Sequence, residues 1–338
     1  MFINKIENKN NLGVEIITGI RPTGNLTIAN YLGAVAPILE LQEKGLSPMV
    51  FVADLHALTD SEPEVVKKYI FEVVADYIAL GVDPTKTKIF IQSEIEKEIS
   101  LLTIYLSRLI SVSELLRVPT LKDKLKNNAK LETANALLLL YPVMMASDIL
   151  IQRSKTVPVG EDQLAHLEVA RELARRFNKK YGNVFPEPKP MIIKSLRVLS
   201  LKGDGKMSKS NPDGAIFLTD DKKTVIKKIK SAQTATEGKM SQQLESHILV
   251  AKNLAKTEEQ RNEIDEIIKE HKKGEQVMGN FKNLLADIIN SFLSDFQNKR
   301  ANIIKDKQYI LDILEEGKKQ ATDNAIKTLE LVKRSMYK

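Results

Sequence analysis

Short β-branched runs alternate with helical patterns through the first half of the chain. The runs with the composition of buried strands are VEIIT (14–18), MVFVA (49–53), KIFIQ (88–92) and TVPVG (156–160). Helical patterns lie between them, including residues 30–44, which Pro37 should kink, and residues 63–80. This alternation predicts an α/β fold, in which helices cover both faces of a doubly wound, parallel, Rossmann-like sheet.

Only helical patterns follow residue 215, and each has a charged outer face. We therefore expect two domains. Residues 1–215 would form the α/β domain. Residues 216–338 would form an all-helical domain, whose last helix is free to pack back on the first domain.

Composition narrows the classes of function. The 338 residues include 51 Lys and Arg against 44 Asp and Glu, and the net charge of +7 favours polyanionic partners without requiring them. The chain has no cysteine, which excludes disulfides, thiolate metal sites and cysteine nucleophiles. Its four histidines are not closely paired, which argues against a metal site.

Two segments bear on the location of the protein. The first ten residues are polar and lack the apolar core of a signal peptide, so we expect a cytoplasmic protein. The apolar run at residues 134–151 has nearly the length of a membrane span, but Pro142 and Asp148 interrupt it. We interpret this run as a buried helix and expect no membrane contact.

A loop after the first expected strand is a candidate phosphate site, because ligands of open parallel sheets bind outside the carboxyl ends of the strands. Residues 18–30 (TGIRPTGNLTIAN) leave the strand and enter a helix. Backbone amides at a helix N-terminus suit phosphate, and Arg21 adds a planar donor. A strand-to-helix turn needs the same glycines, so both interpretations stay open at this point.

Two further loops occupy comparable positions. In residues 157–163 (VPVGEDQ), Glu161 and Asp162 either stabilise a helix N-terminus or accept hydrogen bonds from ribose hydroxyls. Residues 203–210 (GDGKMSKS) lie between turn-forming residues. They form either a solvated tip or a loop that closes its two lysines on polyphosphate.

Taken together, these motifs resemble the class I aminoacyl-tRNA synthetases. The Lys-Met-Ser-Lys-Ser signature of that class is intact at residues 206–210, and its His-Ile-Gly-His signature corresponds to residues 27–30. Thr and Asn replace the two histidines, as is common among the tryptophanyl-tRNA synthetases. In this comparison Ala29 replaces a frequent glycine, and Arg21 stands where many relatives have glutamine. The segments similar to bacterial tryptophanyl-tRNA synthetases span essentially the whole chain: GIRPTGNLTIANYLGA, YPVMMASDIL, PVGEDQLAHLEVARELARRFN, GKMSKSNP and KKIKSAQT.

The resemblance implies a tryptophan--tRNA ligase, which forms tryptophanyl-adenylate and pyrophosphate from tryptophan and ATP and then transfers the acyl group to tRNA(Trp). The attacking carboxylate is already an anion, so the enzyme must supply positioning and positive charge rather than a base. Lys206 and Lys209 are implied as catalytic residues, and Mg²⁺ would bind the phosphates rather than a protein cage. The implied ATP-binding residues are Arg21, Pro22, Thr23, Ala29, Asn30, Gly160, Glu161, Asp162, Val198, Lys206, Met207, Ser208, Lys209 and Ser210.

The resemblance also assigns tryptophan selection to the helix around residue 145. Tyr141, Met145 and Asp148 fall at i, i+4 and i+7 on one face, and His56 is a candidate for the same pocket. Tyr141 and Met145 are as readily interpreted as core residues. Asp148 suits the indole N–H, a donor without acceptor capacity, unless it forms a salt bridge with an arginine. His166 is interpreted as a packed or partly exposed helix residue rather than a catalyst.

The implied partners are tRNA(Trp), L-tryptophan and a second copy of the chain in a homodimer. The helical domain would read the anticodon, and a lysine cluster there either meets phosphates or forms a solvated face: Lys222, Lys223, Lys227, Lys228 and Lys230. Lys122 and Lys124 either contact ATP or belong to a solvated run. Three alternatives remain: a tyrosyl-tRNA synthetase, which MMASDIL and VGEDQ disfavour; a small-molecule nucleotidyltransferase, which leaves the helical region unexplained; and a non-enzymatic RNA-binding relative, against which the intact loops argue.

Overall fold

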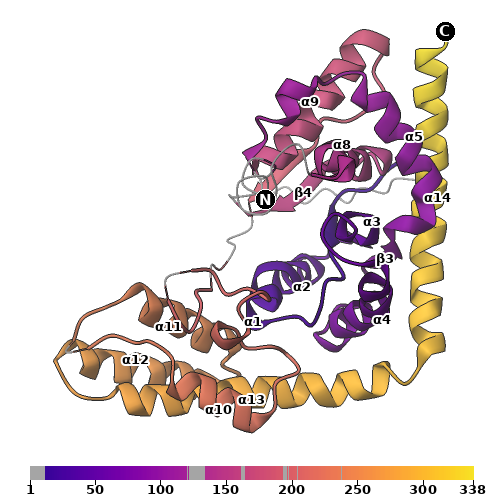
Figure 1. Ribbon diagram of the computed structural model, residues 1–338. Helices are drawn as coiled ribbons and strands as arrows, with labels where there is room; N and C mark the ends of the chain where they lie inside the picture. Colours follow the sequence, from indigo (N-terminus) through magenta and orange to yellow (C-terminus); the bar gives the residue numbers. More distant parts are fainter. Residues whose placement is uncertain are drawn as a thin grey trace, which may run out of the picture.

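The computed structural model describes residues 12–119, 121, 134–160, 164–192, 196, 198–203, 205–236 and 238–338. Strands and helices alternate in the first part of the chain (Figure 1). In order, the elements are β1 (Ile17–Ile20), α1 (Ile28–Asn30), the π-helix η1 (Tyr31–Val35), α2 (Ala36–Glu43), β2 (Met49–Val52), α3 (Asp54–Ala57), α4 (Pro63–Ala79), β3 (Lys88–Ile91), the 3₁₀ helix η2 (Gln92–Ile95), α5 (Glu96–Ser107), α6 (Val112–Leu115), α8 (Ala136–Ile151), β4 (Thr156–Val159), α9 (Leu164–Tyr181) and β5 (Lys189–Ile192).

The strands are parallel, and the order in which the chain adds them to the sheet reverses at β1. β1, β2 and β3 are neighbours in that order, and β4 pairs with β5. A single parallel bridge between Ile16 and Thr156 joins β1 to β4. The resulting order, β3-β2-β1-β4-β5, reverses between β1 and β4, which is the switch point where ligands bind in such sheets. The predicted α/β fold with a parallel sheet is confirmed.

Two predicted features of the sheet need correction. The first strand begins at Ile17 instead of residue 14, because the backbone groups of Val14 and Glu15 bond to residues 152–156, the segment that leads into β4. β5 was not expected, since KPMI contains lysine and proline and most of its residues are exposed. Pro190 is tolerated there because β5 lies at the edge of the paired strands.

Alternate residues of β2 serve two hydrophobic cores, as the period of a strand requires. Val50 and Val52 belong to the core on the α4 side, which continues into the helical half of the chain. Met49 and Phe51 belong to the other core, together with residues of α5, α8 and α9. α8 corresponds to the apolar run predicted as a buried helix, and 11 of its 16 residues are buried. No helix in the described ranges is both long enough and apolar enough to span a membrane.

Pro37 has the effect that its position in the sequence predicts. The segment expected as one helix is divided into α1, the wide turn η1 and α2, and Pro37 lies in the first turn of α2. A proline in a first turn needs no partner for its missing N–H, and the wider π-turn before it removes the clash of its ring with the preceding turn.

The elements after residue 211 are helical: η5 (Pro212–Gly214, a 3₁₀ turn), α10 (Lys222–Lys230), α11 (Gln242–Leu254), α12 (Glu258–Lys272), α13 (Met278–Ile303) and α14 (Lys307–Met336). In Figure 1, α13 runs along the helical half, and α14 turns back along the α/β half. α14 packs against β3, where Gly317 lies so close that an added Cβ would be 1.9 Å from the carbonyl oxygen of Ile89. Arg300 of α13 also bonds Asp76 and Glu72 of α4.

The segment after the Lys-Met-Ser-Lys-Ser loop is paired with the first signature loop. Ile28 N donates to Ile216 O at 3.0 Å, and Leu218 N donates to Leu26 O at 2.8 Å. These bonds hold the start of the helical half beside the entry to α1. The division of the chain at residue 215 stays a prediction.

Candidate active site

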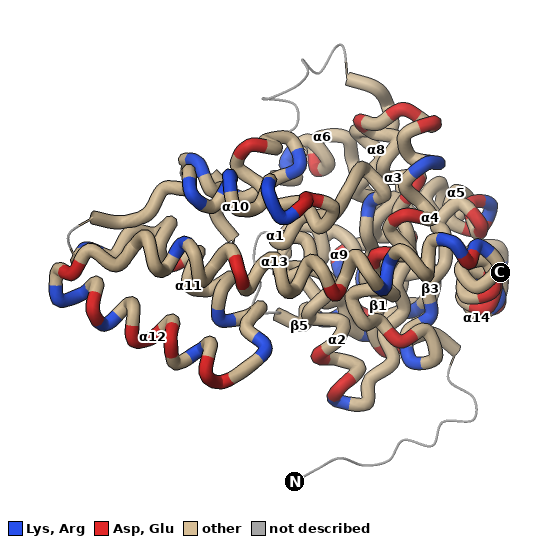
Figure 2. The backbone as a smooth tube through the Cα atoms, turned by 90° about the horizontal axis from the view of Figure 1, so that it is seen from below, with Lys and Arg blue, Asp and Glu red and all other residues tan. Residues whose placement is uncertain are grey.

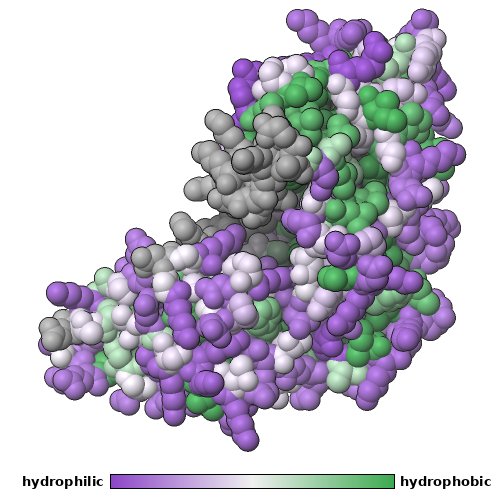
Figure 3. Space-filling view, viewed as in Figure 1, coloured by the Kyte–Doolittle hydropathy of each residue, from purple (hydrophilic) through white to green (hydrophobic). Residues whose placement is uncertain are grey.

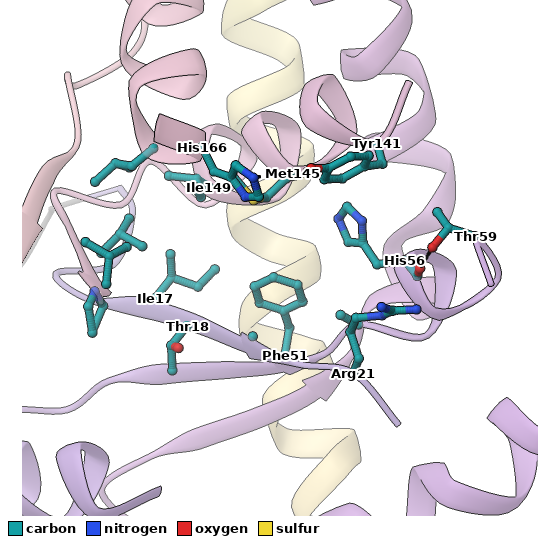
Figure 4. A pocket seen from close by; sticks show the side chains of 16 residues that line it. Ile17, Thr18, Arg21, Phe51, His56, Thr59, Tyr141, Met145, Ile149 and His166 are labelled. Carbon is teal, nitrogen blue, oxygen red and sulfur yellow. Dashed lines mark hydrogen bonds between the residues drawn. The ribbon is translucent and has the colours of Figure 1, made fainter. Parts of the chain in front are cut away.

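A cavity of about 460 Å³ lies at the switch point of the sheet. Its lower wall comes from β1, β2 and β4, and its upper wall comes from α8 and α9 (Figure 4). Most of the lining is apolar, and a few polar groups face it, as in small-molecule sites generally. The lining residues are Ile17, Thr18, Gly19, Arg21, Phe51, Ala53, His56, Thr59, Tyr141, Met145, Ile149, Val157, Pro158, Val159, His166 and Leu167.

His56 and Asp148 form a buried pair beside this cavity. His56 Nε2 lies 2.8 Å from Asp148 Oδ2, and Gln92 Nε2 donates to both carboxylate oxygens at 2.8 and 2.9 Å. Gln92 Oε1 also accepts a hydrogen bond from the backbone N–H of His56. The described partners of Asp148 are therefore a histidine and a glutamine, instead of the arginine considered as an alternative from the sequence.

Burial raises the pKa of the Asp148 carboxyl, and the hydrogen bonds from His56 and Gln92 oppose that rise. Asp148 is only 3% exposed and is not one of the residues that line the cavity, whereas His56 lines it. The structure thus brings the two predicted residues together, and of the two only His56 lines the cavity. An ionised carboxylate only accepts hydrogen bonds, so His56 Nε2 would be the donor to Asp148.

Tyr141 and His166 close the cavity from the helical side. The Tyr141 hydroxyl and His166 Nε2 are 3.2 Å apart, and the two rings meet edge to face. Met145 lies one turn after Tyr141 and also lines the cavity. His166 is packed, as the sequence indicated, but it faces the cavity. Its place on the buried stripe of α9, four residues before Ala170, is the signal that could have shown this.

The sheet contributes wall residues that the sequence analysis did not select. Ile17 and Phe51 rise from β1 and β2 toward α8 in Figure 4, where Met145 and Ile149 lie opposite them. Their signal is the strand period, because residues of neighbouring strands that face the same core share one side of the sheet. To use this signal, one must know the register between the strands, which cannot be read from the sequence.

The first signature loop ends in a capping box. Thr27 is the N-cap of α1, and its hydroxyl accepts a hydrogen bond from the backbone N–H of Asn30 at 3.3 Å. The side-chain oxygen of Asn30 accepts from the backbone N–H of Thr27 at 3.0 Å in return. Ala29 lies between them and is half-buried. The two residues that replace the class histidines thus fix the start of the helix.

The Lys-Met-Ser-Lys-Ser loop is held in place at Met207 and at Lys209, and Lys209 contacts the first signature loop. Met207 is buried, and its backbone N–H donates to Val198 O at 3.0 Å. Lys209 Nζ donates to Gly24 O at 2.7 Å. Burial lowers the pKa of Lys209 to about 8, an effect that the Asp76 carboxylate opposes and the Arg21 guanidinium increases. Lys206 is exposed, so only one of the two predicted lysines lies against the first loop.

The other predicted ATP-binding residues are distributed around this loop. Arg21 forms an ion pair with Asp60 and lines the cavity, and the Ser208 and Ser210 hydroxyls are 3.0 Å apart. Pro22 and Val198 are buried, Thr23 is half-buried, and Gly160 directly follows β4. Glu161 and Asp162, and also Lys122 and Lys124, lie outside the described residues, so their proposed roles stay predictions.

Most lysines of the α10 cluster are exposed. Figure 2 marks their positions along the backbone in blue. Lys223, Lys227 and Lys230 surround an open hollow with Ile226. Lys228 differs from them, because its ammonium donates to Ala215 O and to Asp220, both at 2.8 Å. Lys228 therefore stabilises the fold in this structure. Among the residues with described positions, no group of three or more His, Cys, Asp or Glu side chains could hold a metal ion.

Comparisons with known proteins identify the family. The family model for tRNA synthetases class I (W and Y) matches residues 9–294. The tryptophan--tRNA ligase of Halalkalibacterium halodurans is 38% identical, over 95% of this chain and 97% of the relative. The crystal structure of tryptophanyl-tRNA synthetase from Mycoplasma pneumoniae is 31% identical with a TM-score of 0.84, over 96% of this chain and 98% of that chain.

A second solved structure was determined with small molecules bound. It is the Campylobacter jejuni tryptophanyl-tRNA synthetase in complex with ADP and tryptophan, which is 29% identical with a TM-score of 0.81, over 96% of this chain and 100% of that chain. These matches span both halves of the chain and confirm the resemblance seen in its motifs. The chain belongs to the class I tRNA synthetases for tryptophan and tyrosine, and within them to the tryptophan--tRNA ligases.

Proposed function

We propose that this tryptophan--tRNA ligase forms tryptophanyl-adenylate in the cavity between the sheet and α8, and then transfers the acyl group to tRNA(Trp). ATP is its second substrate. The observation that carries the proposal is a cavity at the switch point with an apolar body and a polar end, built beside the docked signature loop. An indole ring needs such a cavity, because it is largely apolar and carries one N–H donor.

Asp148 is proposed as the acceptor of the indole N–H, which tryptophan would reach past His56, the member of the pair that lines the cavity. A carboxylate has about four acceptor positions, and the three hydrogen bonds from His56 and Gln92 leave one for a ligand. Gln92 and His56 also hold the carboxylate in one orientation. Tyr141 and Met145 would bound the ring on the α8 side, which limits the depth and shape of the site.

Positive charge is the main contribution proposed for the signature loops. The tryptophan carboxylate attacks the α-phosphorus, and negative charge grows on the departing pyrophosphate. Lys209 would exchange the Gly24 carbonyl for the phosphates, and Lys206 would approach them from its exposed position. Mg²⁺ is proposed to bind the phosphates, since hard oxygen ligands and retained water suit it there. The further ATP contacts proposed are Arg21, Pro22, Thr23, Ala29, Asn30, Gly160, Glu161, Asp162, Val198, Met207, Ser208 and Ser210.

A tRNA surface is proposed on the helical half. The exposed lysines of α10 carry fixed positive charge that would hold the phosphate backbone without reading its sequence. Protein synthesis takes place in the cytoplasm, and we assign the enzyme to that compartment.

A homodimer is proposed through the apolar surface near α5 and α6. Ile104 and Val112 are 63% and 60% exposed, and both helices pack against α8. Figure 3 shows apolar side chains gathered over this part of the molecule. Sedimentation velocity should give a dimer for the wild type and a monomer for Ile104→Lys. A monomeric wild-type protein would contradict the proposal.

Amino-acid-dependent exchange of pyrophosphate into ATP tests the proposed activity. Tryptophan should support exchange, and tyrosine should not support it above background. Lys209→Met is the matched variant that tests the charge of the loop lysine, since it keeps most of the apolar stem and removes the ammonium group. Exchange with tyrosine alone would identify the rival synthetase, and no exchange with either would favour a non-enzymatic relative.

A further inference from the structure

Phe51 lies across the neighbouring strand of the sheet. Gly19 of β1 pairs in register with Phe51 of β2. A Cβ added at Gly19 would lie 2.4 Å from Cζ of the Phe51 ring, and 2.7 and 2.8 Å from its two Cε atoms. Carbon atoms do not approach that closely, so the tip of the ring occupies the space that a side chain at position 19 would need. Gly19 has no positive φ angle to explain its presence.

The ring of Phe51 is held from behind and faces the cavity. Phe90 of β3 pairs in register with Phe51, and the two ring centroids are 6.0 Å apart with planes tilted by 34°. Phe90 does not line the cavity, whereas Phe51 does. In Figure 4, Phe51 stands on the sheet side of the cavity and Met145 lies on the α8 side. The space between them is bounded by an aromatic ring on one side and a thioether on the other.

We propose that Phe51 is a specificity-determining residue, whose ring stacks on the indole of tryptophan, and that Gly19 is the residue that admits the ring to this position. The inference rests on the proposed function, because it requires tryptophan in this cavity. Offset stacking of two aromatic rings adds to the gain from burial alone, and Met145 can hold the other indole face through its polarisable sulfur. A two-ring indole overlaps Phe51 over a larger area than a phenol does, so the stack favours tryptophan over tyrosine.

The test measures kcat/KM in tryptophan-dependent pyrophosphate exchange for Phe51→Leu and for Phe90→Leu as its matched control. Both variants lose the same atoms from neighbouring residues on one side of the sheet, but only Phe51 lines the cavity. Phe51→Leu should lower kcat/KM for tryptophan by about tenfold, and Phe90→Leu by less than about threefold.

Ring-fluorinated tryptophans separate stacking from a structural effect. Fluorine withdraws electrons from the indole face and strengthens its stacking on an electron-rich phenyl ring. It also strengthens donation by the indole N–H, an effect common to all variants. The wild type and Phe90→Leu should therefore gain more from added fluorines than Phe51→Leu does. Equal fluorine dependence in all three proteins would overturn the proposal.

Gly19→Ala tests the second part of the proposal, that Gly19 makes room for the Phe51 ring. Its Cβ should displace the Phe51 ring and raise KM for tryptophan by about tenfold or more, while the same change in a Phe51→Leu background should cost less than about threefold, since the ring tip is gone. Equal costs in both backgrounds would overturn the role of Gly19. If Gly19→Ala does not fold, recovery of folding and exchange in the double variant supports the pair, and its failure counts against it. A wild-type protein without tryptophan-dependent exchange would refute the proposed function itself.

Discussion

MgATP binding should draw a proton from solvent onto Lys209. In the structure its ammonium is held by the Gly24 carbonyl, and burial lowers its pKa from 10.5 to about 8. Burial disfavours the charged form, so the neutral amine is abundant above pH 8. Phosphate oxygens beside the amine have the opposite effect, because they stabilise the ammonium. ATP should thus return the pKa of Lys209 toward its ordinary value.

The expected uptake follows from these two values. At pH 9, a lysine with a pKa of about 8 is about one-tenth protonated, and one with a pKa near 10.5 is almost fully protonated. Binding at pH 9 should therefore take up about 0.9 proton per site. At pH 7 the lysine is already about nine-tenths protonated, so the uptake should fall to about 0.1.

Calorimetry measures this quantity directly. MgATP is titrated into the enzyme without tryptophan, in buffers of one pH that differ in ionisation enthalpy. The slope of the observed enthalpy against that ionisation enthalpy gives the number of protons. The phosphates of ATP are fully ionised at pH 9 and contribute no proton. Lys209→Met should bind with no uptake at either pH. Uptake that persists in Lys209→Met, or is absent from the wild type at pH 9, would refute this account of the loop lysine.

Three further outcomes are expected. Lys209→Ala should slow adenylate formation by a factor on the order of 100 to 1000 while leaving tryptophan binding without ATP unchanged, which stopped-flow and equilibrium binding can separate. The affinity for tRNA should fall as the salt concentration rises, and a salt-independent affinity would contradict phosphate contacts. Lys223→Ala should reduce the slope of log affinity against log salt concentration by about 1, whereas Lys319→Ala on α14 should not change it. Asp76→Ala should lower the free energy of unfolding by about 3 kcal/mol in urea titrations, because Arg300 loses a buried partner; a change below about 1 kcal/mol would contradict this.

Local patterns predicted the elements of the fold well. Runs of β-branched residues marked β2, β3 and β4, and unbroken apolarity marked α8 as buried. Both signals depend on neighbouring residues, so one sequence is enough to read them. β5 was not predicted because an exposed edge strand has no apolar pattern. β1 begins later than expected because Val14 and Glu15 bond to the segment before β4, a pairing that depends on the whole sheet.

The contacts of the site were harder to predict, because they join distant parts of the chain. His56 and Asp148 are 92 residues apart, and Lys209 and Gly24 are 185 apart. Motifs named three of these four residues without showing which partner each would take. Phe51 appeared only as a strand residue, since its place in the cavity depends on the register with Gly19. Residue type and order could therefore indicate the chemistry, but only the packed sheet shows the geometry.

The most direct test of tryptophan recognition compares kcat/KM for tryptophan and for its sulfur isostere, which lacks the N–H donor. A hydrogen bond to a charged group is worth roughly 1.5 to 3 kcal/mol, and an acceptor position left unfilled on the buried Asp148 should widen the gap further. The ratio of the two constants is independent of the fraction of active enzyme, so it can be measured even in a destabilised variant. We predict a large preference for tryptophan in the wild type and a much smaller one in Asp148→Ala. The same ratio in both proteins would mean that Asp148 does not read the indole nitrogen.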